Sequence, residues 1–479
     1  MNNTRLTTFF LLFPIIISLS ILPISNSHAE HLKFSNYKII NLSNNNGTSD
    51  NPQIATSGNN IYVVWTDNTT GNGDIYFKMS SDNGKTFDGT KNLSNNNGTS
   101  DNPQIVTSGN NIYVVWTDNT TGNGDIYFKM SSDNGKTFDG TKNLSQNLDG
   151  QANDPEIAIV NTTIYVVWDD DTAINGGIRM KVSTDGGNIF SITKVINQKG
   201  DIASGQLDID VDQTSNQLYI TWSTNNNNIS EILYRTSSNN GLELSNIKTI
   251  SSTGIGENIN PKIVKTNNGL IFVFWEDNTA TLASQVIQSG FIKSRSDNFD
   301  IKYKVSSDNG LNFSSLEYLS HNVGDSNDMD VMSMNDNSVY TVWRDTTQKD
   351  SNNTAMEVKG LADIRFRMIQ TDLQNQTFSI NVSNNTGGIA DSPKVYGDNQ
   401  RIAIVWNDLN KLHNSSDIFV TSKNITETKF SPPLNISNNN GNSSKQQIAF
   451  SNNQTDIVWK DDTTGNGDIY LWTSMLSPS

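Results

Sequence analysis

Cysteine is absent from this chain of 479 residues, and histidine is rare. Without cysteine the protein has no disulfide framework, no thiolate zinc site and no cysteine nucleophile. The histidines are scattered, so neither a histidine-based metal site nor a Ser-His-Asp triad is indicated: His28, His31, His321 and His413. A chain of this length can bury a sufficient core without covalent cross-links.

Positive charge is also scarce, because 33 Lys and Arg residues face 49 Asp and Glu residues, for a net charge of −16. This balance disfavours nucleic acids and anionic membranes as partners. It suits a soluble envelope protein, or one that takes up cations. No window carries a long helical period. No stretch after the N-terminal leader is apolar and long enough to span a bilayer.

The first 29 residues have the layout of a signal peptide. Arg5 supplies a positive start, residues 9–22 form a short apolar run, and Ser27-His28-Ala29 is a small-x-small cleavage site. We therefore predict an exported protein that is secreted, extracellular or at the cell surface. An uncleaved anchor is the alternative, and Pro14 and the polar end of the leader argue against it.

A repeat organises the rest of the chain. Residues 59–94 recur letter for letter at 110–145, and weaker copies continue to the C-terminus. A period of about 50 residues is typical of repeat architectures. Within the unit, IYVVW (61–65) and DIYFKMS (74–80) are β-branched and aromatic runs separated by Asn, Asp and Gly. These runs predict strands joined by turns.

Each copy offers four short strands. A P-x-I/V element opens most copies, a strand ending in Trp follows, then a D-I-Y strand, then an N-L-S strand. The Trp strand occurs eight times: Trp65, Trp116, Trp168, Trp222, Trp275, Trp343, Trp406 and Trp459. Eight four-stranded units favour radial blades. Because a Trp stands in every unit, we expect these side chains to form core between blades, with a carbohydrate platform as the alternative.

The turn after the third strand carries the most specific motif. Residues 80–87 read S-x-D-x-G-x-T-F, and the pattern recurs at 131–138, 183–190 and 306–313, with degraded copies elsewhere. It resembles the Asp-box, or BNR repeat, of sialidase-like β-propellers. The resemblance implies a hairpin turn between the third and fourth strands of a blade, in which Asp accepts turn N–H groups and Gly permits positive φ. The predicted structural carboxylates are Asp82, Asp133, Asp185 and Asp308.

The two ends of the chain complement each other. The last copy stops after its third strand, while residues 34–43 near the N-terminus read as a lone fourth strand. We predict an all-β, eight-bladed β-propeller of four-stranded antiparallel blades over residues 30–479, with eight repeats of about 50–65 residues. The N-terminal strand would close the last blade and cover its edge. Six or seven blades remain the alternative.

Two acids recur on the loop between the second and third strands. One lies two residues after Trp and the other begins the third strand, so the pair should face across a hairpin neck. Carboxylates with loop carbonyls are ligands that Ca²⁺ prefers, and no other cofactor is indicated. Because the twelve-residue spacing of an EF-hand loop is absent, we expect no cofactor and expect both acids to hold loop N–H groups as Asx turns, with a Ca²⁺ site as the alternative. The Ca²⁺ candidates are Asp67, Asp74, Asp118, Asp125, Asp461 and Asp468.

Two copies carry long insertions in that same loop, at residues 278–299 and 346–362. Insertions on one face of a repeat protein often mark its binding side. The alternative is that they are long surface loops without a function, which a fold tolerates at little cost in stability. These segments and their flanks bring most of the positive charge on that face. The candidate ligand-binding residues are Lys293, Arg295, Arg344, Lys359, Arg365 and Arg367.

The resemblance also raises a hydrolase alternative. Sialidase-like enzymes combine an arginine triad, a Tyr–Glu nucleophile pair and an Asp acid/base, and their early F/Y-R-I-P motif is absent here. After the leader the chain has no Arg before Arg179. We therefore predict a binding or scaffold module for a glycan, peptide or envelope component, with exo-α-sialidase-type hydrolysis as the alternative and no catalytic residue assigned. The oligomeric state is not indicated.

Asn-x-Ser/Thr sequons are frequent, which makes an exported protein a candidate for glycosylation. An Asn-, Ser- and Thr-rich chain also produces sequons by chance. Examples are Asn41, Asn68, Asn92, Asn119, Asn161, Asn312, Asn424 and Asn453.

Overall fold

The computed structural model describes residues 33–146, 150–171, 176–197, 203–226, 229–251, 256–279, 287–288, 291–292, 298–349, 355–357, 360–371, 378–384, 388–410, 414–452 and 454–477. The predicted signal peptide and the candidates Lys293, Arg295 and Lys359 lie outside these residues. Every helix or strand assigned within them is a strand. In this part of the chain, no helix long and apolar enough to cross a membrane occurs.

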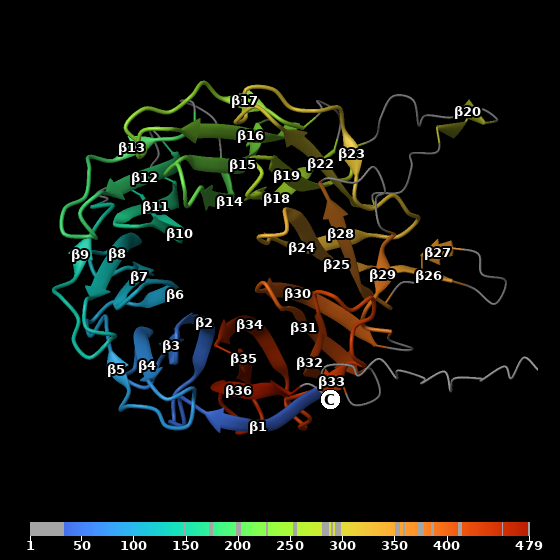
Figure 1. Cartoon of the computed structure of the whole chain (residues 1–479). Helices are drawn as coiled ribbons and strands as arrows, with labels where there is room; N and C mark the ends of the chain where they lie inside the picture. The colour runs from blue at the N-terminus through green and yellow to red at the C-terminus, as the bar shows by residue number, and fades with distance from the viewer. Residues whose placement is uncertain are drawn as a thin grey trace, which may run out of the picture.

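Eight four-stranded sheets are arranged in a ring (Figure 1). In each sheet the strands pair with their neighbours in chain order, all antiparallel, with the first strand nearest the centre. This arrangement confirms the predicted eight-bladed β-propeller.

The first four blades follow the chain without interruption. Blade 1 contains β2 (Ser49–Ser57), β3 (Asn60–Asp67), β4 (Asp74–Ser80) and β5 (Lys91–Asn92). Blade 2 contains β6 (Ser100–Ser108), β7 (Asn111–Asp118), β8 (Asp125–Ser131) and β9 (Lys142–Asn143). Blade 3 contains β10 (Ala152–Val160), β11 (Thr163–Asp170), β12 (Gly177–Ser183) and β13 (Lys194–Val195). Blade 4 contains β14 (Ala203–Val211), β15 (Leu218–Asn226), β16 (Ile229–Ser237) and β17 (Lys248–Thr249).

The next two blades carry the insertions. Blade 5 contains β18 (Asn258–Lys265), β19 (Ile271–Asp277), β22 (Asp300–Ser306) and β23 (Glu317–Tyr318), and its insertion includes β20 (Ile287–Gln288) and β21 (Phe291–Ile292). Blade 6 contains β24 (Ser326–Ser333), β25 (Ser338–Asp345), β28 (Asp363–Gln370) and β29 (Ile380–Asn381), and its insertion includes β26 (Thr347–Lys349) and β27 (Ala355–Glu357). Each insertion pairs its two short strands with each other, separately from the blade.

The last two blades complete the ring. Blade 7 contains β30 (Ile389–Gly397), β31 (Arg401–Asn410), β32 (Ser415–Asn424) and β33 (Leu434–Asn435). Blade 8 contains β34 (Ser443–Ser451), β35 (Gln454–Asp461), β36 (Asp468–Ser477) and, as its fourth strand, β1 (Lys33–Asn41). The first and last strands of the chain therefore pair, as predicted, with Ile39 opposite Trp472.

The hydrophobic core lies between neighbouring blades. Each of the eight repeated Trp side chains is at most 1% exposed. Trp116 of blade 2, for example, packs in one cluster with Tyr62, Val64 and Phe77 of blade 1. The prediction that the tryptophans form inter-blade core is confirmed, since alternating strand residues from two sheets interdigitate there.

Polar contacts repeat between the same neighbours. Lys78 Nζ donates to the carbonyl of Leu42, and Lys129 Nζ donates to that of Leu93, both at 2.8 Å. The aromatic residue of the turn motif also crosses to the previous blade: the Phe138 ring packs edge-on against Phe77 at 5.0 Å. Its side chain therefore joins two blades.

Candidate functional site: the mouth of the central channel

All eight inner strands have a register shift near their start, and in seven of them this bulge includes a residue with positive φ. In β2 the pairing with β3 shifts register between Asp50 and Gln53. The bulge residues have φ between 49° and 56°: Asn51, Asn102, Asp154, Asn260, Asp328, Ser392 and Lys445. Asn and Asp adopt this conformation more readily than most residues. Pro52, the next residue, has no N–H group, so it fits a position where the hydrogen-bonded pairing of the strands is interrupted. A bulge turns side chains away from the regular alternation.

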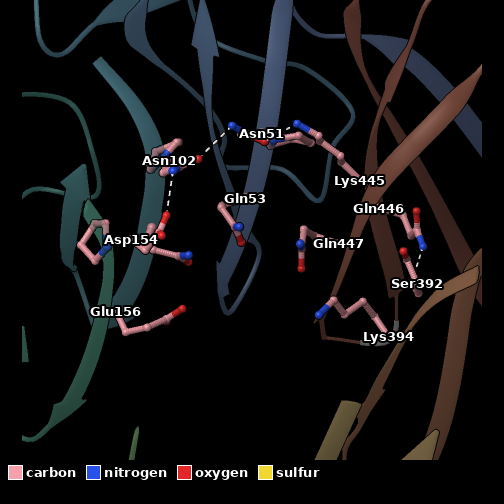
Figure 2. Close-up of a pocket in the computed structure, with 14 residues that line it drawn as sticks. Asn51, Gln53, Asn102, Asp154, Glu156, Ser392, Lys394, Lys445, Gln446 and Gln447 are labelled. Atoms are coloured by element: carbon pink, nitrogen blue, oxygen red, sulfur yellow. Dashed lines mark hydrogen bonds between the residues drawn. The ribbon is translucent and has the colours of Figure 1, made fainter. Parts of the chain in front are cut away.

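The bulge residues form a hydrogen-bonded collar around part of the channel mouth. Lys445 Nζ donates to Asn51 Oδ1 at 2.7 Å, Asn51 donates to Asn102 at 3.0 Å, and Asn102 donates to Asp154 at 3.0 Å (Figure 2). These bonds connect blades 8, 1, 2 and 3 in order. The collar fixes the backbone from which the next residues project.

A ring of eight side chains follows on the inner strands. Each lies in register opposite the residue that precedes a repeated Trp. This channel ring consists of Gln53, Gln104, Glu156, Asp208, Lys262, Asp330, Lys394 and Gln447. All eight line pockets along the inner strands.

The larger pocket at the mouth, of about 430 Å³, is lined by blades 1, 2, 3, 7 and 8. We call it the amide pocket, because Gln53, Gln104 and Gln447 line it. Figure 2 shows Gln53 and Gln447 directed into this space, with Glu156 and Lys394 facing from opposite sides. No hydrogen bond from the side chains of the three glutamines is found within the described residues, so their amides can serve a ligand.

The charge of Glu156 is sensitive to pH. Burial within the channel raises the pKa of this carboxyl to about 7, although Lys262 and Lys394 lower it in part. Near neutral pH the side chain therefore exchanges between a carboxylate and a neutral hydrogen-bond donor.

A second pocket, of about 340 Å³, is lined by blades 4 to 7 and shares Ser392 and Lys394 with the amide pocket. We call it the acid pocket. Its wall includes Glu276, which is 2% exposed, and Asp328. Burial raises the pKa of Glu276 to about 7 and that of Asp328 to about 6; the carboxyl of Asp391 beside Asp328 adds to the second shift.

The three predicted ligand-binding arginines within the described residues make contacts inside the scaffold. Arg344 donates to Asn327 at 3.1 Å and lies 3.8 Å from Asp391. Arg365 donates to the Thr347 carbonyl at 3.4 Å. Arg367 donates to the Leu319 carbonyl at 2.9 Å and so ties blade 6 to blade 5. None of the three lines the amide pocket or the acid pocket, and their proposed role in binding stays a prediction.

The other described arginines also form contacts within the scaffold, each in a different blade. Arg179 lies 3.8 Å from Asp170, Arg235 donates to the Ile196 carbonyl at 2.8 Å, and Arg401 donates to the Gln454 carbonyl at 2.9 Å. None of the six arginines that the structure describes lines any of the three pockets along the inner strands.

The predicted Ca²⁺ pairs do face each other, since Asp67 lies in register with Asp74, Asp118 with Asp125, and Asp461 with Asp468. Their oxygens accept protein donors. Asp67 accepts Asn45 Nδ2 at 2.6 Å and Ser49 Oγ at 2.8 Å, while Asp74 accepts Ser94 Oγ at 2.7 Å. Within the described residues, no group of three or more His, Cys, Asp or Glu is arranged to hold a metal ion.

We expect the melting temperature to be the same in chelator and in millimolar Ca²⁺, because a cation at Asp67 would have to displace these donors. Thermal unfolding monitored by circular dichroism tests this. A melting temperature that rises with Ca²⁺ concentration would instead establish binding to the native state by mass action.

The Asp residues of the turn motif act within their own turns. Asp82 Oδ1 accepts the Thr86 N–H at 2.9 Å, and Asp82 Oδ2 accepts the Thr86 hydroxyl at 2.7 Å. These bonds lower the pKa of Asp82 to about 2. Equivalent bonds to the residue four positions on are made by Asp133, Asp185 and Asp308. None of these carboxylates lines a pocket at the mouth.

Neither the channel ring nor the acid pocket was predicted from the sequence. One signal was available: the middle residue of the P-x-I/V element is the ring residue in five blades, namely Gln53, Gln104, Glu156, Lys262 and Lys394. Variation at this position between otherwise similar copies marks it as unnecessary for the fold. Glu276, which follows a repeated Trp, had no comparable signal.

The sequence matches no protein-family model and no curated protein. Solved structures of similar fold include the polysaccharide lyase Uly1 (11% identity, 78% of this chain and 89% of that chain covered, TM-score 0.47). An ulvan lyase is also similar (9% identity, 92% of this chain and 96% of that chain covered, TM-score 0.47). The same holds for the intramolecular trans-sialidase of Ruminococcus gnavus (9% identity, 75% of this chain and 89% of that chain covered, TM-score 0.38). At this identity the likeness concerns the propeller fold alone.

Proposed function

We propose that this chain is an exported binding module that holds a hydroxyl-rich glycan at the channel mouth and breaks no bond. The observation that carries this proposal is the set of three glutamines on adjacent blades 8, 1 and 2. Gln447, Gln53 and Gln104 occupy the same register position, line one pocket and are not used by the scaffold. The proposal of export rests on the leader, residues 1–29.

Amide side chains suit hydroxyl groups because each presents two N–H donors and an acceptor oxygen. Sugar hydroxyls both donate and accept, so one amide can satisfy a hydroxyl in either sense. Three amides on adjacent blades offer several such contacts in one pocket, and Pro52 and Pro103 of the same pocket add apolar area. A few placed polar groups on an apolar surface are what a small-molecule site requires.

The experiment combines Gln53→Met, Gln104→Met and Gln447→Met and measures binding to an array of neutral and acidic oligosaccharides. Methionine keeps the length of the side chain and removes its hydrogen bonds. Each lost hydrogen bond is worth about 0.5–1.5 kcal/mol, so affinity should fall at least about tenfold. Gln400→Met, at an exposed position outside the pockets, is the matched control. Unchanged binding by the triple variant would contradict the proposal.

A second candidate function, sialidase-like hydrolysis, is favoured by one observation. Glu276 and Asp328 lie in one pocket with pKa values raised to about 7 and 6, and raised carboxyl pKa values are typical of general acids. The six arginines engaged in the scaffold argue against a sialidase grip. Release of sugar from sialylated glycans by the purified protein, abolished by Glu276→Gln, would replace the binding proposal with this one.

A further inference from the structure

The acid pocket contains a buried carboxylate oxygen without a partner. Glu276 Oε2 accepts Asn260 Nδ2 at 3.0 Å, whereas no hydrogen bond reaches Oε1 within the described residues. The N–H groups of Asp328 and Met329 lie near enough to lower the pKa of Glu276 in part, but neither makes a hydrogen bond of normal geometry to it. An unpaired buried carboxylate oxygen is costly for the fold.

Apart from Asp169 in blade 3, the other blades have no acid at this position, so the scaffold does not require one. The residue after the repeated Trp is Thr66 in blade 1, and its hydroxyl donates to Asp101 of the next blade at 2.7 Å. In blade 4 Ser223 donates to Gln206 at 3.1 Å, and in blade 8 Lys460 donates to Asp50 at 2.8 Å. A donor therefore fills this position in several blades, and an ionised Glu276 cannot act as one.

The charges around Glu276 do not balance. Three cations of the neighbouring elements each lie near one acid: Lys262 is 3.7 Å from Asp208, Lys394 is 3.8 Å from Asp330, and Arg344 is 3.8 Å from Asp391. Glu276 and Asp328 have no ion-pair partner among the described residues. If all eight of these side chains were ionised, the group would carry an excess of two negative charges. Four of the eight line the acid pocket itself, namely Glu276, Asp328, Lys262 and Lys394.

Protons partly offset this excess. The raised pKa values of Glu276 and Asp328 mean that each carboxyl binds a proton readily near neutral pH. A cation close to either carboxylate would stabilise its ionised form and lower its pKa. The pKa of Lys262 is also raised, chiefly by Asp208. Burial is the largest cause of both shifts, so a ligand that donates N–H groups to these carboxyls would stabilise their ionised form. No described group of acids is arranged for a metal ion.

We propose that the acid pocket binds a primary ammonium group, carried by a hydroxylated ligand such as an amino sugar, against Glu276 and Asp328. An ammonium has three N–H donors, which can serve the unpaired Glu276 Oε1, the Asp328 carboxylate and the Ser392 hydroxyl that lines the same pocket. A neutral polyol would fill the hydrogen bond without balancing the charge. An anionic ligand would add to the excess. The inference does not depend on the three glutamines.

Binding of the ammonium requires both carboxylates to be ionised, so it releases protons. For one group with a pKa of about 7, competition with protons weakens binding about tenfold at pH 6 relative to pH 8. The affinity rises with pH because the ammonium and the proton compete for the same carboxylate. An anionic ligand would show the opposite dependence, and a neutral ligand a weak one.

The test uses the whole protein and isothermal titration calorimetry with three probes of one six-carbon skeleton: glucamine, sorbitol and gluconate. The amine of glucamine stays protonated through pH 8. We expect glucamine to bind at least about tenfold more tightly than sorbitol or gluconate, with an affinity that rises about tenfold from pH 6 to pH 8. Buffers of different ionisation enthalpy should report proton release.

Glu276→Gln should abolish the preference for glucamine and most of its pH dependence. Asp169→Asn is the matched control, because Asp169 occupies the same position after Trp168 in blade 3 and lies outside the acid pocket. The combined glutamine variant should bind glucamine normally, which separates this inference from the proposed function. Equal binding of glucamine and sorbitol by the unaltered protein, or a preference for gluconate, would overturn it whether or not the variants fold.

Discussion

Removal of residues 30–43 is expected to lower the melting temperature sharply, because the deletion opens the ring. It removes β1 and leaves the outer edge of β36 without its hydrogen-bonded partner. It also removes Leu42, which is 0% exposed, and Phe34, whose ring packs edge-on against Trp472 at 5.0 Å. Ser43, which donates to Asp468 at 2.8 Å, is lost as well. An exposed strand edge also favours aggregation.

Two single substitutions separate burial from strand pairing. Leu42→Ala should cost about 2–5 kcal/mol, the usual range for a fully buried leucine. Ile39→Ala, at a side chain that is 43% exposed, should cost much less. Urea unfolding measures both. If the truncated protein melts like the mature chain, closure through the N-terminus does not stabilise the ring.

The second large effect is expected at Asp67. Its carboxylate accepts Trp65 Nε1 at 3.1 Å, the Thr69 N–H at 2.9 Å and the Thr69 hydroxyl at 2.5 Å, in addition to Asn45 and Ser49. Asp67→Asn replaces one acceptor oxygen by a donor, so buried donors lose their partner. Hydrogen bonds to charged groups are worth about 1.5–3 kcal/mol each, and we expect a loss of about 3–4 kcal/mol in unfolding free energy.

The repeat supplies both a replicate and a control. Asp118 makes the same contacts in blade 2, so Asp118→Asn should give a similar loss. Asp88→Asn, at an exposed side chain, should be nearly neutral. Equal stability of the Asp67 and Asp88 variants would show that the loop carboxylate does not organise the blade.

The effect at Asp67 should also depend on pH. Burial alone would raise the pKa of this carboxyl, but the hydrogen bonds from Thr69, Asn45 and Ser49 outweigh burial and hold the pKa below its usual value of 3.8. A group with a lowered pKa stabilises the fold above its usual pKa, and this contribution is lost as the pH falls through the folded value. The difference between the Asp67→Asn variant and the unaltered protein should therefore shrink below about pH 3.8.

Much of the fold could be predicted because its determinants are local and repeated. The β-branched and aromatic run IYVVW favours a strand, and Asp82 with Gly84 favours a turn by hydrogen bonds within a few residues. The lone strand at residues 34–43 matched the missing strand of the last copy, which identified the closure. The Asp67–Asp74 pairing also followed from the sequence, since two acids flanking one hairpin must face each other.

The site could not be predicted in the same way. The bulge shifts register by one residue, and such a shift moves a side chain from one face of a strand to the other. Whether Gln53 faces the channel or a neighbouring blade therefore depends on the backbone conformation of Asn51. The sequence also could not show that Arg367 is used between blades, because its acceptor, the Leu319 carbonyl, belongs to another blade.

The sequence by itself determined the number of blades, the closure of the ring and the acidic character of the chain, because periodicity, turn chemistry and composition are properties of neighbouring residues. Only the tertiary structure decided which charges meet. Glu276 and Asp328 come from different blades and meet in one pocket, where desolvation, and for Asp328 also the neighbouring Asp391 carboxyl, raises their pKa values. Burial and charge balance depend on every element around a group, and no single stretch of sequence contains them.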